Sequence, residues 1–342
     1  MTPQKPKPSL KKKISSTTDS TNKEPKRYDF VPLSNSGTNR GKVVGHEAYK
    51  EELINGKLSL DLTVQTSSFV ATGHIVLGSD VSANVPLIKT AYHRNQKLLI
   101  PGSSLKGAVR SAYEAITKSC LCKTKATVPD EYSECRVTRK NRESEELVCP
   151  ACQVFGAMGW QGIVSFPDVV GEQASDNIGF VPSLYKPQPD RGTIKGRKFY
   201  HHYIEVDNKA EKGLDAQIAT RNYVFKTTLH LKNISQTQLG TLLIVLGQDA
   251  RYPMALKVGG GKPIGMGTMT VSVKSLEKHQ NLKERYSSYF SQECDRLTDE
   301  ELKSFVDRVI ASAHKSLVEK QQLEKLAEIL KWPTDKALPE NI

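Results

Sequence analysis

Short stretches of the chain alternate apolar and polar residues, and this period of two predicts β-strands. The clearest stretch covers residues 58–77, where Leu58, Leu60, Leu62 and Val64 alternate with polar neighbours. Weaker signals of the same kind, bounded by Gly, Pro or polar residues, predict further strands at residues 97–100, 162–166, 223–231, 254–258 and 269–273.

Two of these strands are followed by apolar residues at helical spacing. One helix is predicted at residues 107–117, and a second runs from Ser235 to Leu246, with Ser235 as a residue type that caps helices. Residues 276–342 are charged and mostly helical in pattern, which predicts a C-terminal helical extension. Two strand–helix units with strands that can pair antiparallel predict an α+β fold with a ferredoxin-like, RRM-like core of βαββαβ type.

The octapeptide at residues 100–107, Ile-Pro-Gly-Ser-Ser-Leu-Lys-Gly, predicts a strand end, a tight turn and a helix start. The Pro-Gly pair breaks the strand, and Ser103 or Ser104 can cap the helix. The first helical amides would then face the same region as Lys106 and Arg110, where they can bind an anion such as phosphate. An ordinary capped helix with two solvated cations explains the same residues about equally well.

The net charge of the chain adds a weaker signal. The 342 residues carry a formal net charge of +12, which favours an acidic partner such as nucleic acid. Half of that charge lies in residues 1–27, a Pro-, Ser- and Lys-rich segment that predicts a disordered basic arm. No apolar run approaches the roughly 20 residues that cross a bilayer, and no signal-peptide core is present, so we expect a cytoplasmic protein without membrane contact.

Five of the six cysteines lie in a polar insertion at residues 118–152. Cys149 and Cys152 form a CxxC pair, and structural zinc needs four soft ligands in a tetrahedron. Cys135 together with Cys122, or with Cys120 in its place, would complete a structural zinc site. A redox CxxC or unpaired reduced thiols are the alternatives, and a cytoplasmic location disfavours a disulfide framework.

Two further segments carry candidate chemistry. A glycine-rich run, in which backbone amides can approach a phosphate closely, contains Gly259, Gly260, Gly261 and Lys262. It matches neither a Walker A loop nor a dinucleotide fingerprint, and a tight turn between strands explains it about as well. Residues 183–205 are rich in Pro, Lys and Arg, which predicts an exposed hairpin or projecting loop.

Together these elements resemble the RAMP superfamily of CRISPR-associated proteins, and within it the backbone subunits of type III effector complexes, the Cas-seven group. The resemblance rests on IPGSSLKG at residues 100–107, on CPACQVFG and GIVSF within residues 149–166, and on GGGKPIGMG at residues 259–267. The opening YDFVPL and the segment GRKFYHH are similar to the branch found with type III-D systems. The resemblance spans residues 28–275 and implies a single RAMP domain there.

The resemblance implies that several residues hold a guide RNA by its backbone, without reading its bases. In such proteins the helix start and the glycine-rich loop contact the guide, and a thumb-like projection interrupts the guide–target duplex. Phe199 would add aromatic stacking to the projection. The candidate RNA contacts carried over to this chain are Ser103, Ser104, Lys106, Gly107, Arg110, Arg197, Lys198, Tyr200, Gly259, Gly260, Gly261 and Lys262.

Cleavage of target RNA depends on an aspartate in the cleaving members of the family. That aspartate stands just before a segment that residues 85–88 match, and Asn84 occupies its position here. Asparagine cannot act as a base or as a charged metal ligand. Asp80, four residues earlier, could substitute for it, with Mg²⁺ as the cofactor of any cleavage, although closing a turn also explains Asp80.

Two functions are compatible with these residues. The first is a backbone subunit that binds guide RNA and target RNA beside other subunits of a type III CRISPR effector complex in antiviral defence, with target cleavage as an optional activity. The second is a stand-alone, metal-independent endoribonuclease that processes guide precursors, with His93, His201 and His202 as candidate acids and bases.

Overall fold

The structure, a computed structural model, describes residues 27–81, 83–121, 127–137, 147–184, 194, 196–207, 212–278 and 295–339. The predicted basic arm lies outside this description except for Arg27, and so does Cys122. Arg27 belongs to the folded body, because its guanidinium donates to Asp207 at 3.1 Å and to the Pro339 carbonyl oxygen at 3.1 Å.

The largest sheet of the described residues is antiparallel throughout and joins strands that are far apart in the sequence. Its order is β17 (Leu256–Lys257), β18 (Thr268–Lys278), β3 (Ile54–Val64), β16 (Val224–Ile234), β12 (Val169–Ala174), β7 (Lys97–Ile100) and β6 (His93–Arg94). Two short strands extend it, because β11 (Val164–Ser165) pairs with β16 and β19 (Asp295–Leu297) pairs with β18.

The alternating stretch that begins at Leu58 forms the centre of this sheet. β3 pairs with β16 on one side and with β18 on the other, and its inward residues are at most 1% exposed, namely Leu58, Leu60, Leu62 and Val64. The alternation that reaches residue 77 is divided between two strands, because β3 ends at Val64 and β4 (Ala71–Leu77) belongs to a second sheet.

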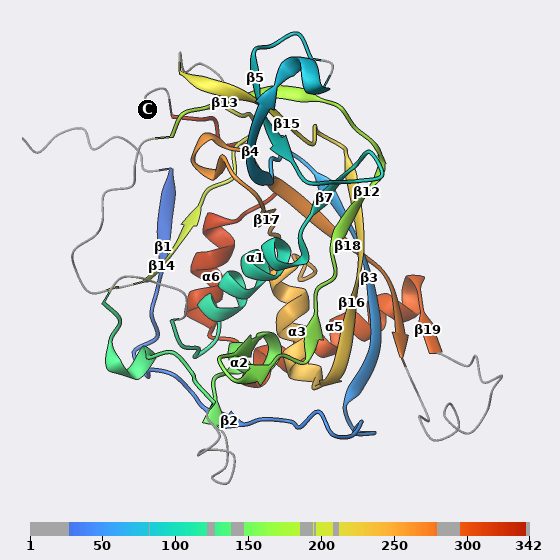
Figure 1. Cartoon of the computed structure of the whole chain (residues 1–342). Helices are drawn as coiled ribbons and strands as arrows, with labels where there is room; N and C mark the ends of the chain where they lie inside the picture. The colour runs from blue at the N-terminus through green and yellow to red at the C-terminus, as the bar shows by residue number, and fades with distance from the viewer. Residues whose placement is uncertain are drawn as a thin grey trace, which may run out of the picture.

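Two helices connect strands of the large sheet, α1 (Gly102–Ala115) and α3 (Gln236–Val245), and they contact each other. α3 begins at Ser235 as predicted. The Ser235 hydroxyl accepts from the Gln238 amide at 3.2 Å, and the Gln238 side chain accepts from the Ser235 amide at 3.0 Å, which is a capping box. Within the predicted C-terminal extension, α5 (Asp299–Ser316) packs on α3, and α6 (Lys320–Ile329) contacts α1, as Figure 1 shows.

The start of α1 differs from the prediction in its position and in its cap. The helix begins at Gly102, its N-cap residue is Pro101, and no side chain caps it from that position, so the predicted cap by Ser103 or Ser104 is wrong. The acceptor comes from elsewhere in the chain, because Asp168 Oδ1 accepts a hydrogen bond from the Gly102 amide at 2.9 Å. Both serines instead lie inside the first helical turn.

A second, four-stranded sheet stands at the top of Figure 1, above α1. Its order is β13 (Ile178–Pro182), β15 (Gly213–Gln217), β5 (Leu87–Ala91) and β4, and the connection between β4 and β5 contains the 3₁₀ turn η1 (Gly78–Val81). The hairpin of β4 and β5 is the element of this sheet that reaches farthest from α1 in the view.

Part of the predicted projecting loop at residues 183–205 is a strand of the folded body. β14 (Gly196–Tyr200) pairs antiparallel with β1 (Tyr28–Pro32), and Tyr28 lies opposite Tyr200. Residues 185–193 and 195 lie outside the described residues. The strand pairing places the basic and aromatic residues of β14 beside α6 and the N-terminal strand.

The remaining elements are short. They are β2 (Gly41–Lys42), β8 (Leu147–Val148), α2 (Pro150–Phe155), β9 (Gly156–Ala157), β10 (Trp160–Gln161) and the 3₁₀ turns η2 (Asp130–Tyr132) and η4 (Lys262–Ile264). The chain is therefore a mixed α+β protein, as predicted. In the described part of the chain, no helix combines the length and apolarity that a bilayer-spanning segment needs.

Two helical glycines are expected to respond in opposite directions to alanine. A Cβ at Gly107 in α1 would meet no atom within 4 Å, so Gly107→Ala should raise the free energy of unfolding by about 0.5–1 kcal/mol through helix propensity. A Cβ at Gly240 in α3 would lie 1.9 Å from the Val309 carbonyl oxygen of α5, so Gly240→Ala should lower that free energy by about 1–3 kcal/mol. Denaturant unfolding of the two variants measures both changes, and equal shifts would contradict the packing of α5 on α3.

Candidate functional site

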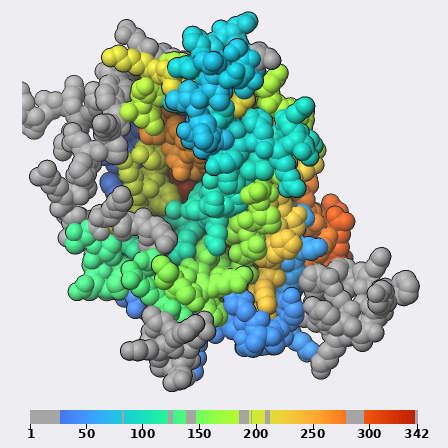
Figure 2. All heavy atoms as spheres, viewed as in Figure 1, coloured from blue at the N-terminus to red at the C-terminus, as the bar shows by residue number. Residues whose placement is uncertain are grey.

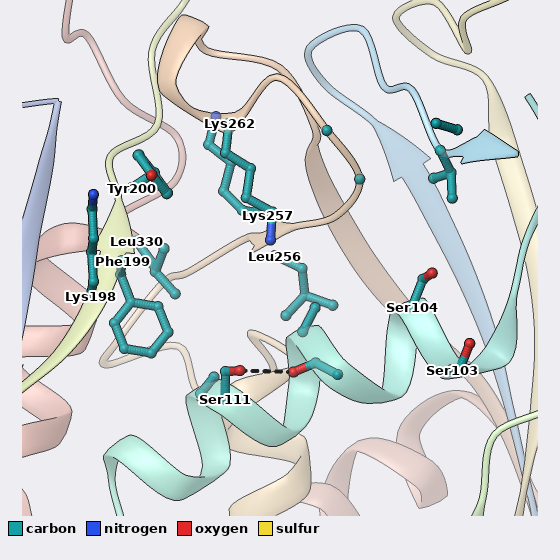
Figure 3. A pocket seen from close by; sticks show the side chains of 17 residues that line it. Ser103, Ser104, Ser111, Lys198, Phe199, Tyr200, Leu256, Lys257, Lys262 and Leu330 are labelled. Atoms are coloured by element: carbon teal, nitrogen blue, oxygen red, sulfur yellow. Dashed lines mark hydrogen bonds between the residues drawn. The ribbon is translucent and has the colours of Figure 1, made fainter. Parts of the chain in front are cut away.

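A cavity of about 540 Å³ lies between α1, β14 and the glycine-rich loop at residues 259–267, and we call it the groove. Figure 2 shows it as a hollow beside the teal surface of α1, and Figure 3 shows its lining. Three segments that the sequence singled out separately meet here. The predicted RNA contacts that line the groove are Ser103, Ser104, Gly107, Lys198, Tyr200, Gly259, Gly260 and Lys262.

The α1 wall of the groove is made of small residues. Ser103, Ser104, Gly107 and Ser111 all face the cavity, and the Ser111 hydroxyl donates to the Gly107 carbonyl oxygen at 2.9 Å, as the dashed line in Figure 3 marks. Open space surrounds the position of a Gly107 Cβ. A wall of this kind admits a bulky ligand close to the helix backbone and offers it hydroxyl groups.

The glycine-rich loop forms the opposite wall and has backbone angles that favour glycine. Gly259 has a φ of +90° and Gly261 a φ of +66°, and a Cβ at Gly259 would lie 2.5 Å from the Phe69 carbonyl oxygen. The glycines are therefore required by the conformation of the loop itself. Lys262 follows directly and begins η4.

The buried Lys257 and the half-buried Lys262 give this wall its charge. Lys257 is 7% exposed, and its Nζ donates to the carbonyl oxygens of Gly265 at 2.8 Å and Met266 at 3.1 Å. Burial lowers the pKa of Lys257 to about 7, with the nearby Lys262 as a second cause, and burial also lowers the pKa of Lys262. Within the described residues, neither lysine forms an ion pair with a carboxylate.

Lys257 is a charged groove residue that the sequence analysis missed. It lies in the short strand β17, between the buried Leu256 and Val258. A charged residue between two apolar ones in a strand was the available signal, since lysine is rarely buried without a functional or structural partner. In Figure 3 the side chains of Lys257 and Lys262 run alongside each other above the cavity.

The β14 wall supplies aromatic rings and a third lysine. Phe199 and Tyr200 line the groove, and Lys198 Nζ lies 3.5 Å from the centroid of the Tyr28 ring and 4.9 Å from that of Tyr200. The Tyr28 and Tyr200 rings meet edge to face at 6.0 Å. Aromatic faces and a cation side by side can stack a base and hold a phosphate.

The other predicted RNA contacts do not line the groove. Lys106 is half-buried, and burial lowers its pKa, with Arg110 as a smaller cause. Gly261 is buried, and a Cβ there would lie 2.4 Å from Met266 Sδ. The arginines Arg110 and Arg197 both point to the buried carboxylate of Glu114, which is 4% exposed.

Beside these arginines lies a buried cluster of four cysteines, which we call the four-cysteine centre. Its members are Cys120, Cys135, Cys149 and Cys152, and their sulfur atoms all lie within 4.8 Å of one another. The centre thus contains Cys120, one of the two alternatives that the sequence left open, and the other alternative, Cys122, lies outside the described residues.

The geometry of the four-cysteine centre fits a tetrahedral metal site. Sγ of Cys120 lies 3.6 Å from Sγ of Cys152 and 3.6 Å from Sγ of Cys149, too far for a disulfide. Zinc–sulfur bonds of about 2.3 Å in a tetrahedron place the sulfurs about 3.8 Å apart. Hydrogen bonds among the four thiols lower the pKa of Cys149 and raise the pKa values of Cys120 and Cys152, which shows how tightly the four sulfurs interact.

The candidate cleavage residues lie away from the groove lining. Asp80 is exposed in η1, at the end of the β4–β5 hairpin, and Asn84 is exposed a few residues later. Ala71, at the other end of β4, lines the groove. A seven-residue strand spans roughly 20 Å, so the hairpin separates Asp80 from the groove by about that length.

The candidate catalytic histidines do not gather at one site. His202 is buried, with its two ring nitrogens 2.9 Å from the Thr268 hydroxyl and 3.0 Å from the Ala255 carbonyl oxygen. Burial, followed by the charge of Lys257, lowers the pKa of His202 to about 3. His201 faces Lys336, and His93 is exposed with its Nδ1 2.9 Å from the Ala91 carbonyl oxygen. No histidine and no carboxylate is among the described residues that line the groove.

Comparison with known proteins gives a family match and two similar solved structures. Residues 61–270, more than half of the chain, match a family model described as the RAMP superfamily. No curated protein sequence matches the chain significantly. The chain is similar to a chain of a "Type IV-B CRISPR Complex", with 20% identity, 64% of this chain and 90% of that chain covered, and a TM-score of 0.34. It is also similar to a chain of the "Crystal structure of Csm3-Csm4 subcomplex in the type III-A CRISPR-Cas interference complex", with 14% identity, coverage of 75% and 97%, and a TM-score of 0.35.

The four-cysteine centre is expected to hold about one zinc ion per chain. Cys149→Ser and Cys120→Ser should each remove this ion, because three thiolates are left where a closed structural site needs four ligands, whereas Cys122→Ser leaves all four members in place and should retain it. Elemental analysis of the purified proteins measures the metal directly. A folded wild-type chain without metal, or a Cys120→Ser chain that retains it, would contradict the assignment.

Proposed function

The chain belongs to the RAMP superfamily, and from this premise we propose that its groove binds the backbone of a guide RNA. The chain would then be a backbone subunit of a type III CRISPR effector complex, where it holds guide and target RNA beside other subunits. The single observation that carries this proposal is the groove itself, in which α1, β14 and the glycine-rich loop converge around three lysines.

The chemistry of the lining supports a nucleic-acid backbone as the ligand. The buried Lys257 and the half-buried Lys262 have no carboxylate partner in the described structure, and charges removed from water are costly unless an opposite charge compensates them. A phosphate diester supplies that charge. Serine hydroxyls, glycine backbone and aromatic rings complete a lining that can hold RNA of any sequence.

The order of the central strands supports the ferredoxin-like, RRM-like core that the sequence predicted. Strands β18, β3, β16 and β12 are neighbours in that order, α1 precedes β12 in the chain, and α3 connects β16 to β18. A βαββαβ unit with β3 as its first strand has this arrangement. We assign the remaining elements to insertions that surround the core and build the groove.

The groove is suited to holding RNA rather than cutting it. Its described lining contains no carboxylate and no histidine, so it offers no carboxylate for a metal ion and no imidazole for acid–base catalysis. Target cleavage by this subunit would fall to Asp80, with Mg²⁺ bound there. The histidine-based precursor nuclease has less support, because His202 is buried with both ring nitrogens engaged and is neutral near pH 7.

Exposed apolar side chains support membership of a larger assembly. Ile75, Leu77 and Leu87 are 53%, 56% and 42% exposed on the β4–β5 hairpin. Neighbouring apolar residues on an exposed hairpin are a common feature of protein–protein contacts. We assign this hairpin to contacts with other subunits of the complex and the four-cysteine centre to structural zinc.

Reversing two groove charges is expected to weaken RNA binding regardless of RNA sequence. Lys198→Glu combined with Lys262→Glu should lower the affinity for single-stranded RNA by at least about tenfold, because two phosphate contacts become repulsive. The slope of log affinity against log salt should decrease by about 1.4. Fluorescence anisotropy with two labelled RNAs of unrelated sequence measures both effects.

The matched control reverses two lysines outside the groove. Lys303 and Lys315 are exposed on α5, so Lys303→Glu with Lys315→Glu makes the same change in net charge. We expect this variant to bind RNA within about twofold of the wild type at moderate salt, where distant charges are screened. Equal losses in the two double variants would show that net charge, and not the groove, governs binding.

RNA binding is expected to take up a proton near Lys257. The pKa of Lys257 is about 7 without a ligand, and an adjacent phosphate would raise it by stabilising the ammonium form. The affinity for RNA should therefore decrease as the pH rises from 7 to 9, by up to about tenfold per unit, and Lys257→Gln should flatten this dependence. Calorimetry in buffers of different ionisation enthalpy counts the proton, and zero uptake at pH 8 would contradict a phosphate at Lys257.

A further inference from the structure

A buried carboxylate joins two walls of the groove. Glu114, near the end of α1, accepts from Arg110 Nε at 2.6 Å with one oxygen, and its other oxygen lies 2.7 Å from Arg197 Nη1. The side chains of Arg110, Glu114 and Arg197 are 17%, 3% and 13% exposed. Buried, charged hydrogen bonds of this length are stronger than neutral ones, and losing one partner is costly.

The same two arginines contact the four-cysteine centre. Arg110 Nη2 donates to Cys152 Sγ at 3.3 Å and Nη1 donates to the Gly156 carbonyl oxygen at 2.8 Å. Arg197 Nη2 donates to the Cys120 carbonyl oxygen at 2.7 Å. Each arginine therefore holds Glu114 with one part of its guanidinium and a cysteine of the centre with another.

The two arginines are also close in sequence to residues that line the groove. Arg197 precedes Lys198 and Phe199 on β14, and Arg110 lies one helical turn from Gly107 on α1. Side chains alternate across a strand. Arg197 points toward Glu114, and Lys198 and Tyr200 lie on the opposite face of β14, where the Lys198 ammonium contacts the rings of Tyr28 and Tyr200. Figure 3 shows α1 and β14 as facing walls of the cavity.

We propose that Arg110, Glu114 and Arg197 are positioning residues that transmit the state of the four-cysteine centre to the RNA groove. This inference rests on the proposed RNA binding. A metal bound by the four sulfurs fixes the positions of Cys120 and Cys152, and these fix the two guanidinium groups. The guanidinium groups, joined through Glu114, hold β14 at the distance from α1 that an RNA backbone requires.

Loss of the metal is expected to release β14 and to lower the affinity for RNA. Without a central ion, Cys120 and Cys152 are no longer held in a tetrahedron, and the arginine contacts to them become mobile. β14 belongs to a two-stranded sheet with β1, outside the large sheet, so few strand hydrogen bonds restrain it. The lysine and aromatic wall of the groove then moves away from α1, and RNA affinity falls.

The test compares Glu114→Gln with Glu172→Gln. Glutamine keeps the shape of Glu114 and removes its charge, whereas Glu172 forms an exposed ion pair with Lys226, away from the groove lining and the cysteines. We expect Glu114→Gln to retain about one zinc per chain, to exchange amide hydrogens in β14 at least about tenfold faster, and to bind RNA about tenfold more weakly. Glu172→Gln should match the wild type in all three measurements.

Removal of zinc by a chelator provides the second half of the test. In the wild type it should accelerate amide exchange in β14, leave exchange in the central β3–β16 pair unchanged, and lower RNA affinity about tenfold. In Glu114→Gln, zinc removal should lower the affinity by less than about twofold further, because the connection is already broken. Equal losses on zinc removal in both proteins would overturn the proposed transmission.

Arg197→Lys keeps the charge but removes the second donor group of the guanidinium. This variant keeps the inference testable if Glu114→Gln does not fold. One ammonium cannot hold both Glu114 and the Cys120 carbonyl oxygen as the guanidinium does, so this variant should also lose RNA affinity with its zinc retained. Wild-type affinity in Arg197→Lys would overturn the inference. Lys262→Glu separates the two proposals. RNA binding that is unchanged by this substitution would overturn the proposed RNA binding in the groove. Amide exchange in β14 would still show whether the four-cysteine centre positions this strand.

Discussion

The close approach of the first turn of α1 to the chain before β12 is the contact on which the site depends. Gly102 has no space for a side chain, because a Cβ there would lie 2.0 Å from the Phe166 carbonyl oxygen. The neighbouring Asp168 accepts from the Gly102 amide and fixes the direction in which the helix leaves. α1 then carries the small groove wall on one face and Arg110 with Glu114 on another, so an error in its start would displace both.

This contact determines which groups of the groove are available to the proposed anionic ligand. An uncapped helix start offers free amides and a positive dipole end, but the Asp168 carboxylate already occupies that position with its own negative charge. The positive charge that faces the cavity therefore comes from lysines on two other elements, and the helix contributes hydroxyls and low steric bulk. The burial of Lys257 and the partial burial of Lys262 disfavour their charged forms, and the proposed polyanionic ligand would compensate this cost.

The sequence predicted those elements whose signals are local. The alternation in β3 and the Ser235–Gln238 capping box are set by residues within a few positions of each other, and the structure confirms them. The CxxC pair likewise identified half of the four-cysteine centre. The cap of α1, the pairing of β14 with β1 and the burial of Lys257 depend on residues far away in the chain, and no periodicity records them. The same reason applies to Arg110 and Arg197, whose ion pairs with the buried Glu114 no local pattern records.

The separation of functions over different elements is a consequence of the architecture. The proposed binding of RNA needs cations and a wall of low steric bulk, and the described lining of the groove has three lysines and small residues but no carboxylate and no histidine. Metal chemistry on RNA would need exposed carboxylates, and Asp80 stands at the end of a hairpin whose length keeps it clear of the groove lysines. A carboxylate beside Lys262 would pair with it and compete with phosphate for its charge. For the proposed binding of an RNA backbone, a groove free of carboxylates is therefore favourable, and a cutting group would have to project from another part of the chain.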